Sequence, residues 1–118
     1  LYVDAWEWRP RELNTEADAM CNRAMDSNSN ILWVNPNISE YFAHKANLHV
    51  SSDGGCRGKG VSATGWVVRA VGWGADGREW VVKLGEGCSI FNTNMSSFEI
   101  EVRAVNEVTA FMDMHFVL

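Results

Sequence analysis

The stretch LHVSSDGG, residues 48–55, decides the fold class, because apolar and polar side chains alternate along it until two glycines follow. Alternation with a period of two is typical of a half-buried strand, so we predict a strand over residues 48–53 and a glycine-rich turn after it. The segments SATGWVVRAV and REWVVKL, joined by the hairpin signal Asp76-Gly77, predict an antiparallel continuation of that strand. These two strands are expected over residues 62–71 and 78–84.

Helical patterns flank the three-strand meander. The segment NTEADAMCNRAM, residues 14–25, has acids in its first turn and one apolar face, and a second apolar stripe at helical spacing runs over residues 95–113. Residues 1–8, LYVDAWEW, suit a strand that Pro10 ends, and residues 26–46 form a connector in which ILWV suits a short strand. We therefore expect an α/β fold with a mixed sheet. The N-terminal strand would join the meander in the same chain or swap into a neighbouring copy, giving a domain-swapped homodimer.

Composition limits the function classes. The chain has 118 residues, 47% of them hydrophobic, which suits one compact domain or part of one, and its first residue is Leu1, as expected for a piece of a longer protein. No apolar run approaches the roughly 18 residues of a membrane helix, so no membrane partner is expected. The three cysteines are widely spaced and suit free thiols in an intracellular compartment, cytoplasm or nucleus. A net charge of −5 argues against a protein that coats nucleic acid, but less against a nuclease whose site must hold cations.

Three groups of acids are candidates for metal binding. Asp53 ends a strand of small residues before two glycines, where cations and a phosphate backbone could approach, although Asp-Gly is also ordinary turn chemistry. Glu99 and Glu101 are two residues apart on the second helix, so at most one faces the sheet and both could be solvated. Asp18 could face a site or simply stabilise the first turn of its helix.

Taken together, these segments resemble one family. Residues 47–112, with SSDGG, SATGWVV and a helix carrying Glu-x-x-Ala, resemble the first half of the ribonuclease H fold. Residues 6–26, WEWRPRELNTEADAMCNRAMD, resemble the end of that fold in its retroelement-type members. The order is permuted, as expected for a circular permutant or for a window across two tandem copies. The resemblance divides the chain into a closing strand and helix (1–26), a connector (27–46) and the first half of the domain (47–118).

The resemblance implies a metal-dependent endonuclease that cleaves the RNA strand of RNA–DNA hybrids with two Mg²⁺ or Mn²⁺ ions. It assigns the metal-binding and catalytic acids to Asp53, to Glu101, which Ala104 follows at the family's spacing, and to Asp18, four residues after Asn14. Glu99 is the second choice for the helix acid. We expect the nucleic acid to contact Gly54, Gly55, Arg57 and Asn94.

Two family features are missing. The fourth acid of the family follows a strand that would come after residue 118, and Asp4 could replace it if residues 1–8 lay beside strand 48–53. The histidine that many members carry before the closing helix is replaced by the segment that starts at Arg9. The alternative function is therefore an inactive ribonuclease H-like module that binds nucleic acid or protein. A nucleotide-binding loop is excluded, because Asp53 and Gly60 occupy positions that need Gly and Ser or Thr.

The tryptophans of the meander have two possible roles. Exposed aromatic rings on a sheet can stack on bases, but buried rings more often fill a core or cover a sheet edge. We predict packing rather than base stacking for Trp66, Trp73 and Trp80.

Overall fold

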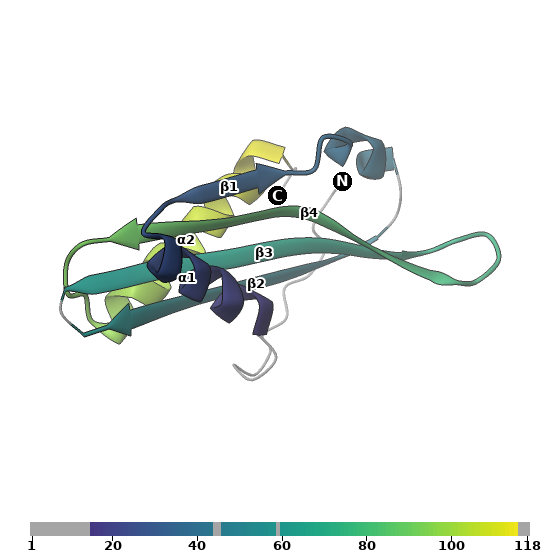
Figure 1. Cartoon of the computed structure of the whole chain (residues 1–118). Helices are drawn as coiled ribbons and strands as arrows, with labels where there is room; N and C mark the ends of the chain where they lie inside the picture. The colour runs from purple at the N-terminus through teal and green to yellow at the C-terminus, as the bar shows by residue number, and fades with distance from the viewer. Residues whose placement is uncertain (1–14, 44–45, 59, 116–118) are drawn as a thin grey trace.

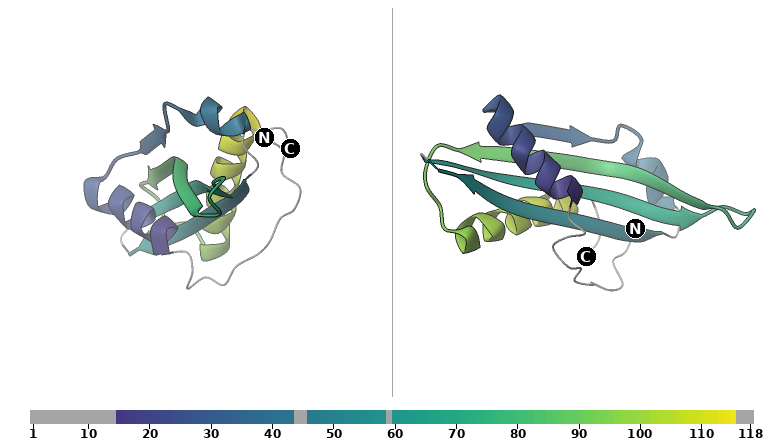
Figure 2. Two further views of the ribbon diagram at one scale, coloured as in Figure 1. Left: turned by 90° about the vertical axis from the view of Figure 1, so that its right-hand side faces the viewer. Right: turned by 60° about the horizontal axis from the view of Figure 1, so that its bottom comes forward.

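The computed structural model describes residues 15–43, 46–58 and 60–115, which form a four-stranded antiparallel sheet with one α-helix on each face (Figure 1; Figure 2). In chain order the elements are α1 (Thr15–Ser27), β1 (Ile31–Val34), the 3-10 helix η2 (Ile38–Ala43), β2 (Asn47–Arg57), β3 (Val61–Trp73), β4 (Glu79–Phe91) and α2 (Ser97–His115). The strands are ordered β1-β4-β3-β2. The α/β class is thus confirmed.

The predicted antiparallel meander is β2–β3–β4, and all its strands are longer than expected. The expected glycine-rich turn after residue 53 begins later, since β2 runs on to Arg57. The third strand was expected to end at residue 84, which is wrong, because β4 continues to Phe91. The cause is that Gly85 and Gly87 lie under aromatic rings of the core, so these glycines serve packing and not a turn.

A mixed sheet was expected, but every pair among the described strands is antiparallel, including β1 with β4. Strand β1 was foreseen only as a short strand inside a connector, and it forms the fourth strand of the sheet. The predicted strand over residues 1–8, with Asp4, lies outside the described residues, as do Asn14 and Arg9 to Glu12.

Both predicted helices are present. Helix α1 ends where Asn28 adopts a positive φ of 49° and the Ser29 amide donates to the Ala24 carbonyl, a left-handed stop of the kind that asparagine tolerates. Ser96 precedes α2, and its hydroxyl accepts a hydrogen bond from the Glu99 amide at 3.1 Å, which satisfies an otherwise free donor of the first turn. Among the helices described, none is long and apolar enough to cross a membrane.

Each face of the sheet has its own core. The face under α2 carries the larger cluster, in which the Trp66 and Phe111 rings lie 4.9 Å apart and are tilted by 41°, and the face under α1 carries a smaller one around Cys21 and Cys88. Packing of Trp66 is confirmed, and Trp80 is half-buried with its ring 5.9 Å from that of Tyr41. The packing prediction is wrong for Trp73, which is 56% exposed.

Candidate metal centre

Asp53 lies within β2 and is only 6% exposed. Its partner on β3 is Gly65, and partners in register project to the same face of the sheet. A Cβ atom on Gly65 would lie 2.3 Å from the carbonyl oxygen of Ala17 and 2.5 Å from the amide nitrogen of Cys21, both in α1. Asp53 therefore points to the face that α1 covers, at the place where this helix comes closest to the strands.

Asp18 lies on the turn of α1 that meets Gly65, and its side chain is exposed. Its Oδ2 atom accepts a hydrogen bond from the Asn22 amide at 3.4 Å. One turn along the same helix is the buried thiol of Cys21, which donates to the Ala63 carbonyl at 3.1 Å. Burial, together with the negative charges of Asp53 and Asp18, raises the pKa of Cys21 to about 12. The two predicted acids therefore lie near one thiol, on one side of the sheet.

This thiol should make the stability of the fold depend on pH in the alkaline range. In the unfolded chain Cys21 ionises near its ordinary pKa of 9.0, whereas in the folded chain it stays protonated until about pH 12. The unfolded state therefore binds fewer protons between these values, and stability should fall as pH rises through them, with a slope of at most about 1.4 kcal/mol per pH unit. Urea titrations of the chain and of Cys21→Ala at pH 8, 9 and 10 measure this. Equal slopes for both proteins would contradict the placement of Cys21.

Glu101 approaches Asp53 from the other face. A Cβ atom on Gly54 would lie 2.7 Å from the carbonyl carbon of Ile100 and 2.8 Å from the amide nitrogen of Glu101, so α2 crosses β2 one residue away from Asp53. Ile100 faces the sheet, and Glu101 follows about 100° further round the helix. On the opposite flank of α2, Glu107 accepts a hydrogen bond from Ser89 of β4. The side of α2 with Glu101 is thus the side toward β2, the strand that carries Asp53.

Glu99, the second choice for the helix acid, lies in the first turn of α2 and is exposed. Its position suits a solvated carboxylate near a helix N-terminus. Of the two glutamates, Glu101 is the one whose backbone contacts β2.

Asp53 and Asp18 therefore lie on the face of the sheet that α1 covers, whereas Glu101 belongs to α2 on the other face. Among the residues that the structure describes, no group of three or more His, Cys, Asp or Glu side chains is close enough together to hold a metal ion. The donors themselves fit Mg²⁺, since all three are carboxylates and hard cations prefer oxygen ligands. To complete a shared site, Glu101 must reach round β2 toward Asp53 and Asp18.

The residues expected to touch nucleic acid each have a contact within the fold. Arg57 donates to Asp26 at 2.7 Å and to Asn22 at 3.4 Å, which ties the end of β2 to α1. Asn94 accepts a hydrogen bond from the Gly60 amide at 2.9 Å and so holds the turn between β2 and β3. Gly54 and Gly55 give α2 and α1 room to approach β2, because Gly54 lies under the α2 backbone and Gly55 under the Cys21 sulfur.

Sequence reasoning missed two polar features of this region. Cys21 was counted only as part of an apolar helix face, although its spacing of three residues from Asp18 puts both on neighbouring parts of one helix surface. The pair Ser89–Glu107 joins β4 to α2, with the second carboxylate oxygen of Glu107 buried and without a partner in the described part of the chain. Nothing in the sequence around either residue of this pair signals it.

Comparison of the chain with protein-family models, with curated proteins and with solved structures found no match.

Proposed function

We propose that this chain is a ribonuclease H-type endonuclease of retroelement origin, which cleaves the RNA strand of RNA–DNA hybrids with two bound Mg²⁺ or Mn²⁺ ions. The observation that carries the proposal is that Asp53 and Asp18, from a strand and a helix far apart in sequence, both lie near enough to the Cys21 thiol to raise its pKa. The fold supports it as well, because the helix that bears Glu101 contacts the same strand at Gly54.

The electrostatics favour a cation here. Removing a carboxylate such as that of Asp53 from water is costly, and a second negative charge at Asp18 adds repulsion that a divalent ion would offset. In the proposed site the carboxylates of Asp53, Asp18 and Glu101 would hold the ions. Bound ions of this kind supply an activated water and stabilise the charge of the leaving oxygen.

The chain's own residues serve to position the candidate acids. Gly65 lets α1 approach β3 beside Asp53, and Gly54 lets α2 approach β2 on the other face. Asn22 holds Asp18 by one oxygen, which leaves the other oxygen available to an ion. Preorganised carboxylates avoid the loss of side-chain freedom that binding would otherwise cost.

An intracellular setting, in the cytoplasm or the nucleus, belongs to the same proposal. The structure contains three free thiols, of which Cys56 is exposed, and exposed thiols persist in reducing compartments.

The test is metal-dependent cleavage. The purified chain is incubated with an end-labelled RNA–DNA hybrid in Mg²⁺, in Mn²⁺ and in EDTA, with the matching DNA duplex and free RNA as controls. The proposal expects RNA fragments from the hybrid only when a divalent ion is present. RNA cleavage that persists in EDTA would instead point to a contaminating metal-independent ribonuclease.

The second candidate is the inactive module. It is favoured by the placement of Asp53 and Glu101 on opposite faces of β2. Hybrid binding that is measurable by fluorescence anisotropy, is equal in Mg²⁺ and EDTA and gives no fragments would establish it in place of the nuclease.

A further inference from the structure

Helix α2 carries two separate apolar surfaces. The second of them consists of Phe98, Val102 and Val105, which are 78%, 40% and 50% exposed. Their spacing of four and then three residues puts them on one line along the helix, here called the outer stripe. Because Phe98 and Val105 are helical neighbours of Glu101, the outer stripe lies on the flank of α2 toward β2. The first surface is buried against the sheet and consists of Ile100, Ala104, Val108, Phe111 and Met112.

The outer stripe differs from the exposed methionine of the same helix. Met114 is also 78% exposed, but it lies two turns after Glu107 and therefore projects from the opposite flank. Large apolar residues exposed singly in this way are normal on a protein surface. Three neighbouring apolar side chains, one of them a phenyl ring, are instead typical of a surface that meets a partner.

The borders of the outer stripe are acidic. Glu99 lies one turn before Val102 on the side toward solvent, and Asp113 lies about three turns beyond Val102 at nearly the same angle. Glu101 borders the stripe on the side toward the sheet. Within the described part of the chain, neither Glu99 nor Asp113 has an ion-pair partner.

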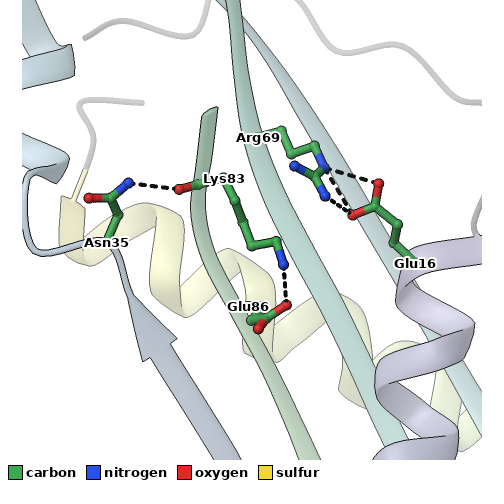
Figure 3. A network of polar contacts seen from close by, with 5 residues as sticks. All are labelled: Glu16, Asn35, Arg69, Lys83 and Glu86. Carbon is green, nitrogen blue, oxygen red and sulfur yellow. Dashed lines mark hydrogen bonds and ion pairs between the residues drawn. The ribbon is translucent and has the colours of Figure 1, made fainter. Parts of the chain in front are cut away.

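The cations of the fold are engaged elsewhere. Arg69 is paired with Glu16 of α1, and Lys83 is paired with Glu86 of its own strand (Figure 3). Arg103 of α2 is turned away from the outer stripe and lies 5.1 Å from the centre of an aromatic ring of β4. A partner of this surface should therefore bring its own positive charges.

We propose that the outer stripe is the docking site for a basic amphipathic helix of another protein. Spacings of four and three residues are those of the contact line between two packed helices, so the apolar face of such a helix would cover the stripe. Its Lys and Arg side chains would pair with Glu99 and Asp113.

The acidic borders decide between this partner and two others. A second copy of the chain would place acid against acid along both borders, and like charges facing each other oppose association. A nucleic acid would bring phosphates to Glu99 and Asp113, where cations are needed to bind it. The proposal goes beyond the nuclease activity and does not depend on it, since the outer stripe contributes no ligand to the candidate metal centre.

A synthetic peptide tests the docking. The probe is a fluorescein-labelled amphipathic helix with Leu at positions i, i+3, i+4 and i+7 and with Lys and Arg on both borders of the Leu face. The control peptide has the same composition in scrambled order, so that its Leu residues share no face. Fluorescence anisotropy should show saturable binding of the probe, with a Kd at least about tenfold lower than that of the scrambled peptide.

Two matched substitutions locate the contact. Phe98→Ser should raise the Kd of the probe at least about tenfold, because aromatic anchors dominate such interfaces. Met114→Ser is the control, since Met114 is equally exposed but lies on the opposite flank, and it should leave the Kd within about twofold. Both side chains are exposed, so both variants should fold, and circular dichroism melts check this.

Charge reversal tests the borders of the stripe. The double variant Glu99→Lys with Asp113→Lys should raise the Kd of the basic probe about tenfold. A second probe with Glu in place of every Lys and Arg should bind this variant to within about threefold of the original affinity, because the charges are complementary again.

No saturable binding, or equal binding of the probe and the scrambled peptide, would overturn the proposal. Equal effects of Phe98→Ser and Met114→Ser would do the same, since the contact would then lie elsewhere. A monomer–dimer equilibrium that Phe98→Ser abolishes in sedimentation would assign the stripe to a second copy. Oligonucleotide binding that the same substitution abolishes would assign it to nucleic acid.

Discussion

Gly65→Ala is expected to destabilise the fold by about 3 kcal/mol, because the added methyl group meets backbone and not a movable side chain. Its Cβ would lie 2.3 Å from the Ala17 carbonyl oxygen and 2.5 Å from the Cys21 amide nitrogen. Neither atom can move without lifting α1 from the sheet. Lifting the helix would also open the small core around Cys21 and carry Asp18 away from Asp53. Urea denaturation followed by tryptophan fluorescence measures the change.

The matched control is Gly58→Ala. A Cβ atom at Gly58 has no neighbour within 4 Å, and this glycine is not among those with positive φ. The same substitution there should change stability by less than about 1 kcal/mol, and the smaller flexibility of the unfolded chain favours a slight gain. If both variants melted alike, α1 would not cross β3 at Gly65, and the shared location of the two aspartates would be lost with it.

The meander was predictable because its signals are local. Alternating apolar residues define each strand, and Asp76-Gly77 marks the hairpin, where Gly77 has the positive φ of 79° that favours glycine. The end of the third strand was placed too early, because the signal that extends it is not local. The strand continues through Gly85 and Gly87, which need to lack a side chain because the rings of Phe111 and Trp66, distant in sequence, lie over them. A single sequence does not reveal which distant side chain covers a glycine.

In the candidate site, too, the local features could be predicted and the long-range contacts could not. That Asp18 follows a helix start and Asp53 ends an alternating run is visible in the sequence, and the resemblance to ribonuclease H supplied the expectation that they meet. The approach of α1 to the strands beside Asp53 depends on Gly65, which no local pattern marked as a contact for α1. The exposure of Trp73 could not be predicted either. Strand alternation shows that Trp73 and Gly72 project to opposite faces, but it does not show which face a helix covers.

Asp53→Asn should abolish the metal-dependent cleavage of hybrids, with a loss of roughly a thousandfold or more. That exceeds the 10- to 100-fold that is typical when a residue merely supports a metal ligand. The amide keeps the shape of the carboxylate but removes the negative charge that holds a divalent ion between the acids. Glu99→Gln is the matched control. It also removes a carboxylate that was considered as a metal ligand, but Glu99 is exposed, so cleavage should be unchanged.

Thermal stability separates this role from a structural one. An ion at one hundred times its Kd stabilises the folded chain by about 2.7 kcal/mol, so Mg²⁺ should raise the Tm of the original chain and of Glu99→Gln but not that of Asp53→Asn. In EDTA, the Tm of Asp53→Asn relative to that of the original chain reports any structural role of the Asp53 carboxylate. A variant that melts early in EDTA would make Asp53 a structural residue. Equal responses of all three proteins to Mg²⁺ would mean that no ion binds between these acids, and the nuclease proposal would fail with it.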